Sequence, residues 1–583
     1  MGCRFVLALW AFVAFSTTSQ ADTPLAELKL QTHRGQEWKL ADAADSELVV
    51  FAFLGTECPL AKLYGPRLQQ LQEQFGDQVA FVGVNANKQD SLTEIGFYVE
   101  SAGIRFPVLK DVGNKLADLL EAERTPEVVV LDRQQNVVYR GRIDDQYTPG
   151  LSASAARERH LAVALQQHLN GQTVSKPRTE AVGCYIGRVK NATPTGAITY
   201  TKHIAPIINA NCLECHRDGQ IAPFSLASYE DIQGWEDTML EVMEQGRMPP
   251  WYADADHGVF SNDARLSAEE KKLLRQWVAN GMPKGDPADL PTPPQFATGW
   301  RLEGPEEDID VIPIYETEQD AFQVPAEGIV DYKYFEVDPG WTEDKYVVAA
   351  EARPDNLSVV HHIIAYIIEP GDRERRRRRM LVGYAPGSLP QVLEEGRAIH
   401  VKAGSKLLFE MHYTPNGSPQ KDRSFIGLKY TEKENVKRTL NGWAAAETEF
   451  RIPARDKNYR VPAEVTVPGN QLLLDLTPHM HLRGKKFKYT LIRKDGLEEP
   501  LLNVPNYDFN WQLTYKLAEP VLLKKGDRIL CEAWYDNSSE NLALHARKPG
   551  VPDQHQATYD AAVEWGDQSF EEMMIGFFTT VDP

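Results

Sequence analysis

The chain has little cysteine, little positive charge and few long apolar runs. Its 583 residues include 6 cysteines, and 63 lysines and arginines stand against 83 aspartates and glutamates, so the formal net charge is −20. This deficit of positive charge argues against a nucleic-acid partner, because phosphate binding needs a basic face. Beyond the N-terminus no apolar run is long enough to cross a bilayer, so we expect no membrane span in the mature chain.

The N-terminus carries the longest apolar segment. Arg4 precedes an apolar run at 5–15, and small residues near Ala21 follow a short polar stretch. This order is typical of an export signal, which predicts a signal peptide at 1–21 that is cleaved near Ala21. We therefore expect an exported bacterial protein, periplasmic or extracellular, with an uncleaved membrane anchor as the alternative.

The length exceeds what one hydrophobic core can organise. Residues 24–170 alternate strand-like and helical stretches, which favours an α/β layer around a central sheet. Residues 199–286 are helical in pattern. Short β-type runs separated by Gly, Pro and Asn fill 320–437 and 440–583. The sequence thus predicts a multidomain protein with one α/β domain, one all-α domain and two all-β sandwiches.

The first domain has a cysteine where a redox thiol would stand. Cys58 begins a helical stretch and Thr125-Pro126 precedes a late strand, an order that resembles the thioredoxin-like redoxin fold. A helix N-terminus lowers the pKa of a thiol, so Cys58 is a candidate redox thiol. However, Ala61 replaces the second cysteine of a C-x-x-C pair, and Gly55 holds the place of the peroxiredoxin threonine. Export permits a disulfide with Cys184, which the sequence does not decide.

The helical region carries the motif C-x-x-C-H. Its members are Cys212, Cys215 and His216. In an exported chain this motif attaches one c-type haem through two thioethers and an axial histidine. The region resembles a class I cytochrome c, which implies a methionine as the other axial ligand. Met248, in a proline-rich loop, is the candidate, while Met243 and Met282 are weaker ones. A disulfide or a zinc site is the alternative for the cysteines.

Five histidines of the C-terminal half lie in strand-like sequence: His361, His362, His412, His479 and His481. Residues two apart on a strand share a face, so His479 and His481 can bind one ion. Adjacent His361 and His362 need a β-bulge to act together, and His412 can complete three nitrogens. Three imidazoles suit copper or zinc, and a thioether beside two imidazoles favours copper(I).

With Met573, these motifs resemble the copper type II, ascorbate-dependent monooxygenases, the family of peptidylglycine α-hydroxylating and dopamine β-monooxygenases. The resemblance implies two jelly-roll sandwiches that each hold one copper. The first would use His361, His362 and His412 to store an electron. The catalytic second copper would use His479, His481 and Met573, with Met574 as the rival thioether. Thr477 replaces the arginine that binds a peptide carboxylate, which argues against peptide amidation.

Together these resemblances imply a copper-dependent monooxygenase that hydroxylates an unidentified small organic substrate with O2. Two coppers and one covalent haem are expected, with electrons supplied through that haem and originally from a periplasmic donor. We expect the two histidine sets to face a common solvent gap. One alternative is a non-enzymatic copper and haem carrier or a copper-handling protein. Another is a thiol peroxidase centred on Cys58.

Overall fold

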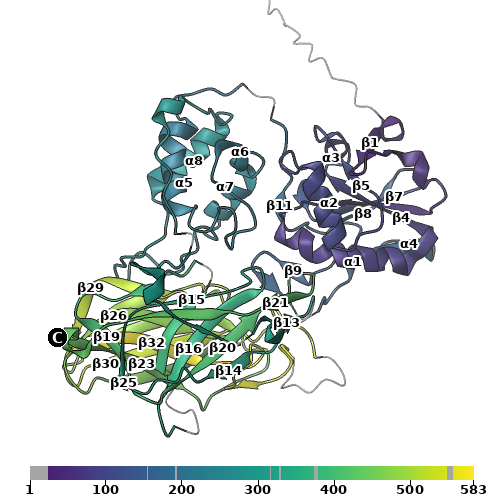
Figure 1. The fold of residues 1–583 in the computed structure, drawn as a ribbon. Coiled ribbons are helices and arrows are strands. Elements are labelled where there is room, and N and C mark those ends of the chain that lie inside the picture. The colour runs from purple at the N-terminus through teal and green to yellow at the C-terminus, as the bar shows by residue number, and fades with distance from the viewer. Residues whose placement is uncertain are drawn as a thin grey trace, which may run out of the picture.

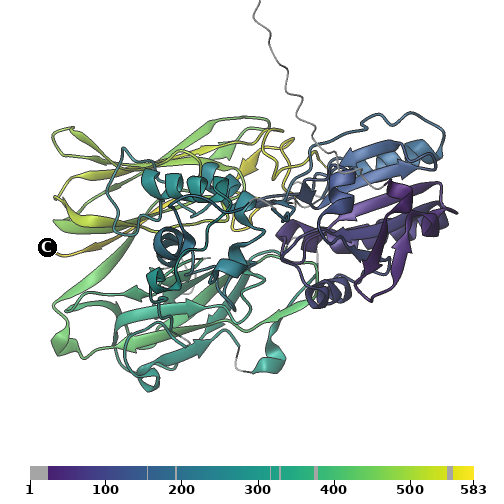
Figure 2. The same ribbon diagram turned by 90° about the horizontal axis from the view of Figure 1, so that it is seen from above.

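The computed structural model describes residues 24–153, 155–190, 193–297, 299–315, 317–326, 330–372, 379–385, 387–547 and 556–583. The expected signal at 1–21 lies outside these residues. Three bodies are visible: a redoxin-like α/β domain, a helical body and a large β-rich region (Figure 1). Seen from above, the helical body overlies the β-rich region (Figure 2). In the described ranges, no helix has both the length and the apolar character needed to span a bilayer.

The α/β domain is built on a seven-stranded sheet in the order β2-β1-β5-β4-β3-β7-β8. Its strands are β1 (Lys29–Thr32), β2 (Glu37–Lys39), β3 (Leu48–Phe53), β4 (Val79–Asn85), β5 (Val108–Lys110), β7 (Glu127–Asp132) and β8 (Val137–Gly141). The helices are α1 (Pro59–Phe75), α2 (Leu92–Ser101), α3 (Lys115–Leu119) and α4 (His160–Leu169). All residues of β3 are buried because its two faces pack into separate apolar cores. The expected thioredoxin-like domain is confirmed.

Two small strand pairs extend this domain. β6 (Arg124–Thr125) pairs antiparallel with β11 (Cys184–Tyr185), which belongs to the connector that leaves the domain. β9 (Tyr147–Thr148) and β10 (Leu151–Ser152) form a hairpin that reaches the β-rich region. The first pair lies where the α/β domain meets the helical body, and the second lies where it meets the β-rich region.

The helical body contains η4 (Tyr200–Ile204), α5 (Ala205–Asn211), α6 (Tyr229–Ile232), α7 (Glu236–Glu244) and α8 (Ala268–Ala279). Ser267 caps α8, since its side chain accepts a hydrogen bond from the backbone N–H of Glu270. In return, the Glu270 carboxylate accepts a hydrogen bond from the backbone N–H of Ser267. Trp277 and Ile204 are buried in its core. Helices therefore occupy 199–286 as expected, while a cytochrome c fold stays a prediction.

The β-rich region has one long sheet shared by two sandwiches. Its order is β12 (Asp310–Pro313), β22 (Phe425–Tyr430), β15 (Lys345–Arg353), β19 (Arg397–Val401), β23 (Arg438–Glu447), β32 (Met574–Val581), β26 (Gln471–His479) and β29 (Tyr515–Leu523), with β18 (Gln391–Val392) beside β15. The parallel pair β19–β23 joins the two halves.

A four-stranded sheet covers each half of the long sheet. The first consists of β14 (Lys333–Val337), β20 (Lys406–Tyr413), β16 (Val360–Ile368) and β17 (Arg379–Tyr384). The second consists of β25 (Tyr459–Thr466), β30 (Arg528–Tyr535), β27 (Gly484–Ile492) and β28 (Glu498–Val504). Two further two-stranded sheets are formed by β13 (Phe322–Val324) with β21 (Gln420–Asp422), and by β24 (Arg451–Ile452) with β31 (Val563–Glu564). Each half encloses its own apolar core.

Candidate metal centre

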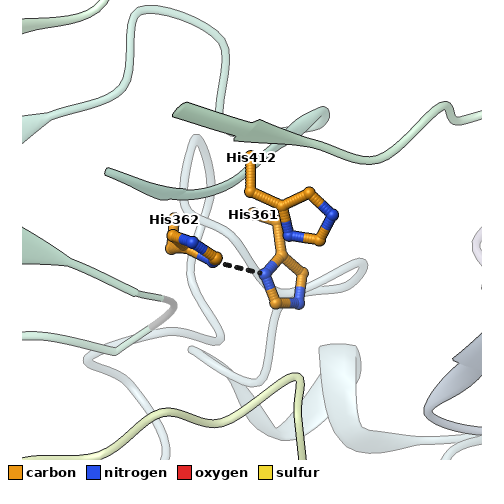
Figure 3. Close-up of side chains that lie close together, drawn as sticks. All are labelled: His361, His362 and His412. Atoms are coloured by element: carbon orange, nitrogen blue, oxygen red, sulfur yellow. Dashed lines mark hydrogen bonds between the residues drawn. The ribbon is translucent and has the colours of Figure 1, made fainter. Parts of the chain in front are cut away.

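Two neighbouring strands bring the first three histidines together. β16 and β20 are antiparallel, with His362 opposite His412, and their register shifts between Val360 and His362. The shift makes His361 the extra residue of a bulge, and a bulge re-aims a side chain that a flat strand would point to the other face. One donor nitrogen from each ring lies within 4.8 Å of the others (Figure 3). These three residues are called the triad below.

The triad is in the protonation state that binds metal. Burial lowers the pKa of each imidazole, and neighbouring rings lower the pKa of His362 and His412 further. Nδ1 of His361 lies 3.2 Å from Nδ1 of His362. Nε2 of His362 and Nδ1 of His412 are buried and have no hydrogen-bond partner among the described residues. Neutral imidazoles with unsatisfied buried nitrogens fit a copper ion.

His479 and His481 form a second set, called the pair below. Their ring centroids are 5.2 Å apart. Nδ1 of His479 lies 2.6 Å from Oε1 of Gln512, and Nδ1 of His481 lies 3.4 Å from the carbonyl oxygen of Glu571. Burial lowers the pKa of His479 to about 4. Because Nδ1 is engaged in both rings, Nε2 is left for a metal, and Nε2 of His481 is buried without a partner among the described residues.

The strand register, continued past the end of the ladder, directs the backbone of Met573 toward the pair. In the β26–β32 ladder His479 lies opposite Ile575. Continuing that antiparallel register by two residues places Met573 beside His481. The neighbouring Glu572 carboxylate accepts a hydrogen bond of 3.0 Å from the backbone N–H of His481, which shows that the two segments meet here.

The two methionines that compete for the thioether role have different surroundings. Met574 is fully buried and belongs to the apolar core of the second sandwich. Met573 is 7% exposed and is not a member of that core. A thioether that fills a core is held by packing, so the structure favours Met573 over Met574 as a ligand.

Two aromatic rings lie between the triad and the pair. The ring centroid of Tyr332 is 4.8 Å from that of His412 and 5.7 Å from that of His481. The Phe509 centroid is 5.5 Å and 6.0 Å from the same two rings. The expected solvent gap is therefore wrong at this point. The physical reason is that the backbone N–H of Tyr332 donates to Oε1 of Gln568 across the seam between the sandwiches, which anchors the segment that carries this ring.

A cavity of about 600 Å³ opens beside the triad. Its lining includes 146–153 of the redoxin-like domain, 412–415 of the first sandwich and 506–510 of the second. His412 is one of the lining residues, and Phe509 lies in the wall between it and the pair. The hairpin β9–β10 therefore forms part of this cavity, although it belongs to a different domain.

Asn510 links the cavity wall to the triad. Its Oδ1 lies 3.2 Å from Nε2 of His361, and its amide nitrogen donates to the carbonyl oxygen of Gly150 in the β9–β10 turn. A hydrogen bond at the outer nitrogen of a metal-binding histidine fixes the orientation of its ring. Gln512 has the same relation to His479.

The residues of the haem motif lie in the helical body, against the first sandwich. Nδ1 of His216 lies 3.0 Å from the carbonyl oxygen of Phe224, which leaves Nε2 as the ligand atom and fits an axial role. No disulfide joins Cys212 and Cys215 in the described part of the chain. A Cβ added at Gly387 would lie 3.8 Å from Sγ of Cys215, so the motif approaches the segment after β17.

The three methionines considered as haem ligands also differ in how they are packed. Met243 and Met282 are buried in the core of the helical body. Met248 is only half-buried and is not a member of that core. Its placement leaves the thioether of Met248 as the candidate second axial ligand.

Cys58 and Cys184 lie side by side, since a hydrogen bond joins their thiols. Ala61 contributes a backbone N–H to Cys58 rather than a second thiol. A Cβ added at Gly55 would lie 2.6 Å from Nδ2 of Asn87, so the threonine of a peroxiredoxin has no room here. The site therefore departs from the thiol peroxidase pattern.

Sequence reasoning missed four residues that shape the metal centre: Tyr332, Phe509, Asn510 and Gln512. They lie outside the strands, and no spacing relates them to the histidines. Only the docking of the two sandwiches brings them to the site.

Two parts of the chain match known families. Residues 21–140 match the AhpC/TSA family, and residues 464–546 match the copper type II ascorbate-dependent monooxygenase, C-terminal domain. The chain therefore combines a thioredoxin-like redoxin domain with a copper monooxygenase-like C-terminal domain. The second match includes the pair, and it implies copper, a substrate and O2. Residues 199–286 lie outside both matches.

Several solved structures are similar to part of the chain. A hypothetical protein from Sinorhizobium meliloti 1021 is 27% identical, with a TM-score of 0.26, over 28% of this chain and 92% of that one. An uncharacterized conserved protein from Geobacillus kaustophilus is 26% identical, with a TM-score of 0.27, over 28% and 90%. A secreted Mycobacterium tuberculosis disulfide oxidoreductase is 18% identical, with a TM-score of 0.18, over 19% and 81%. No curated protein matches the chain.

Proposed function

We propose that the chain is an exported copper-dependent monooxygenase that carries its own c-type haem. The observation that supports this most is the closeness of two sets of buried, neutral imidazoles whose unpaired nitrogens fit metal ions, beside a cavity. The overall reaction is R–H + O2 + two electrons + two protons giving R–OH + H2O. Copper, when bound, supplies the activation of O2 and the one-electron chemistry.

The protein residues divide into two ligand sets. The triad holds one copper, and His479, His481 and Met573 hold the other. Asn510 and Gln512 fix the orientation of one imidazole in each set through its outer nitrogen. Tyr332 and Phe509 exclude water from the space between the sets, because their rings contact histidines on both sides.

The substrate is a small organic molecule that occupies the 600 Å³ cavity. Phe509 and Tyr147 offer apolar contact, while Lys485 and Asp508 offer charged groups to a polar end. A molecule that contacts Phe509 would be separated from His481 by the Phe509 ring. The redoxin-like domain then serves as a wall of the substrate site.

Cys212 and Cys215 would hold the haem through thioethers and His216 and Met248 would bind its iron, and the haem would supply electrons one at a time. Two contacts support a connection between its attachment site and the triad. Cys215 faces Tyr384 of β17 closely enough to influence its pKa, and Tyr384 is opposite Ile363, the neighbour of His362. A tethered donor acts at high effective concentration without a tight complex. A periplasmic electron donor would then recharge the haem.

Metal analysis and haem staining of protein expressed in an oxidising compartment test the cofactors, with two coppers and one covalent haem expected per chain. For activity, the anaerobically reduced protein receives labelled O2 together with a mixture of small organic compounds. A monooxygenase transfers the label into an organic product, whereas an electron carrier reoxidises without one. His481→Ala and Met573→Ala should abolish label transfer. Unchanged transfer in both variants would disprove the proposal.

A further inference from the structure

Cys58 and Cys184 make a second chemical centre that the copper chemistry does not use. Cys58 is the residue before α1 and has 0% of its surface exposed. β11 brings Cys184 opposite Thr125 of β6. Sγ of Cys58 lies 2.9 Å from the carbonyl oxygen of the same Thr125, so both cysteines gather at one residue. Cys184 lies beyond the region 21–140 that matches the AhpC/TSA family.

The close approach of β11 depends on Gly183. Its φ is +139°, a conformation that side chains rarely allow, and an added Cβ would lie 2.1 Å from the carbonyl oxygen of Thr125. A residue with any side chain would therefore push β11 away from β6. The connector is shaped to hold Cys184 against Cys58.

β11 lies at the junction between the redoxin-like domain and the helical body. The backbone N–H of Tyr185 donates to Thr238 of α7 at 2.9 Å. Arg124 of β6 forms an ion pair of 2.6 Å with Glu241 of α7. Cys184 is half-buried at this junction, while Cys58 is covered. A molecule from solvent therefore meets Cys184 first.

The two thiols have unequal acidities. Burial raises the pKa of Cys58, but hydrogen bonds from the Cys184 thiol and from the backbone N–H of Ala61 outweigh burial and lower that pKa to about 6. Donation of its proton to Cys58, together with burial, raises the pKa of Cys184. At neutral pH the pair therefore shares one proton, with the negative charge mainly on Cys58. This asymmetry suits a disulfide whose Cys58 sulfur leaves readily.

We propose that Cys58 and Cys184 are a reversible dithiol–disulfide couple that exchanges with external low-molecular-weight thiols and disulfides through Cys184. In oxidation, Cys184 passes its proton to Cys58, attacks one sulfur of an external disulfide and displaces the other sulfur as a thiolate. Cys58 then gives that proton to the released thiolate, attacks Sγ of Cys184 and displaces the second external sulfur as a thiolate. The protein gains one S–S bond and the external disulfide loses one, while its two sulfurs leave as one thiol and one thiolate, which carry the single proton and the negative charge of the pair.

Reduction runs the other way. An external thiolate attacks Sγ of Cys184, the accessible sulfur, and Cys58 leaves as the thiolate. A second external thiol frees Cys184, so two thiols become one disulfide. The position of β11 thus makes Sγ of Cys184 the sulfur that external thiols reach, while Sγ of Cys58 stays buried.

The test equilibrates the full-length protein in glutathione redox buffers, quenches with acid, alkylates free thiols and maps the peptides by mass spectrometry. We expect a Cys58–Cys184 disulfide in oxidising buffer and two free thiols in reducing buffer. Cys58→Ser should trap glutathione on Cys184. Gly183→Ala should lose the intramolecular disulfide although both cysteines remain. Cys531→Ser, which changes a fully buried thiol of the second sandwich, should behave as the parent.

Three results would overturn the inference. The first is an oxidised protein in which Cys58 and Cys184 both stay free. The second is glutathione captured by Cys531 as readily as by Cys184, which would indicate unfolding rather than a site. The third is Gly183→Ala forming the disulfide as the parent does. None of these readouts uses copper, haem or oxygen, so the proposed monooxygenase can fail independently.

Discussion

Oδ1 of Asn510 lies 3.2 Å from Nε2 of His361. Asn510 belongs to the second sandwich and His361 to the first, so this contact crosses the seam between them. The same amide also donates to Gly150 of the redoxin-like domain. One side chain of the second sandwich therefore contacts both the redoxin-like domain and the ring of a candidate metal ligand in the first sandwich.

The first prediction concerns this contact. Asn510→Ala removes the hydrogen bond at the outer nitrogen of His361, so the ring loses its fixed orientation. We expect copper affinity at the triad to fall about 10–100-fold. Competition with a chelator measures it. Asn506→Ala, a change in the same cavity wall, serves as the control. Equal affinities in the parent and both variants would show that the contact does not orient the ring.

The second prediction separates the two methionines. Met574→Ala leaves a void in the core of the second sandwich and should lower the free energy of unfolding by about 2–5 kcal/mol. Met573→Ala removes a residue outside that core, so the loss of stability should be smaller, while label transfer from O2 is abolished. Denaturant unfolding of the copper-free variants and product analysis of the loaded ones give both values. The opposite pattern would make Met574 the ligand.

The residues that sequence reasoning found share a local signal. His479 and His481 are two apart at a strand end, and alternation alone places them on one face. The strand Leu48–Phe53 could be predicted because every residue in it is apolar, and the structure shows that every one is buried. The motif at Cys212 likewise depends on spacing within five positions. Such features need no knowledge of the partner strands.

What the sequence could not show depends on contacts between distant segments. The bulge at His361 exists only relative to the register of β20. Tyr332 and Phe509 reach the histidines only after the sandwiches dock, and the parallel pairing of β19 with β23 that joins them has no local pattern. For the same reason, the expectation of a solvent gap failed. Pairwise spacing says nothing about which side chains fill an interface.

The third prediction separates haem from copper. The double variant Cys212→Ser, Cys215→Ser has no thiols for thioether bonds, so haem staining after denaturation should be lost. The triad and the pair are elsewhere, in the β-rich region, and copper content should stay at two per chain. Oxygen consumption driven by ascorbate should persist, because a diffusible reductant bypasses the haem. Loss of copper from this variant would show instead that the helical body is needed to form the metal centre.

The fourth prediction concerns pH. The pKa of Cys58 is lowered to about 6, whereas burial raises the pKa of Cys531. In the reduced protein, the ultraviolet absorbance of thiolate should therefore appear as pH rises through about 6 and disappear as pH falls below it. Subtracting the signal of Cys58→Ser isolates this thiol.

The groups that face the two thiols decide how this titration responds to substitution. Tyr98 of α2 faces Cys58, and Arg124 and Arg247 face Cys184. Cys184→Ala removes the hydrogen bond that lowers the pKa of Cys58 most, so the midpoint should move upward. Cys184→Ser keeps a hydroxyl donor and should move it less. A midpoint that is the same in Cys184→Ala and in the parent would mean that the thiolate is stabilised by the start of α1 alone, and that Cys184 has no part in it.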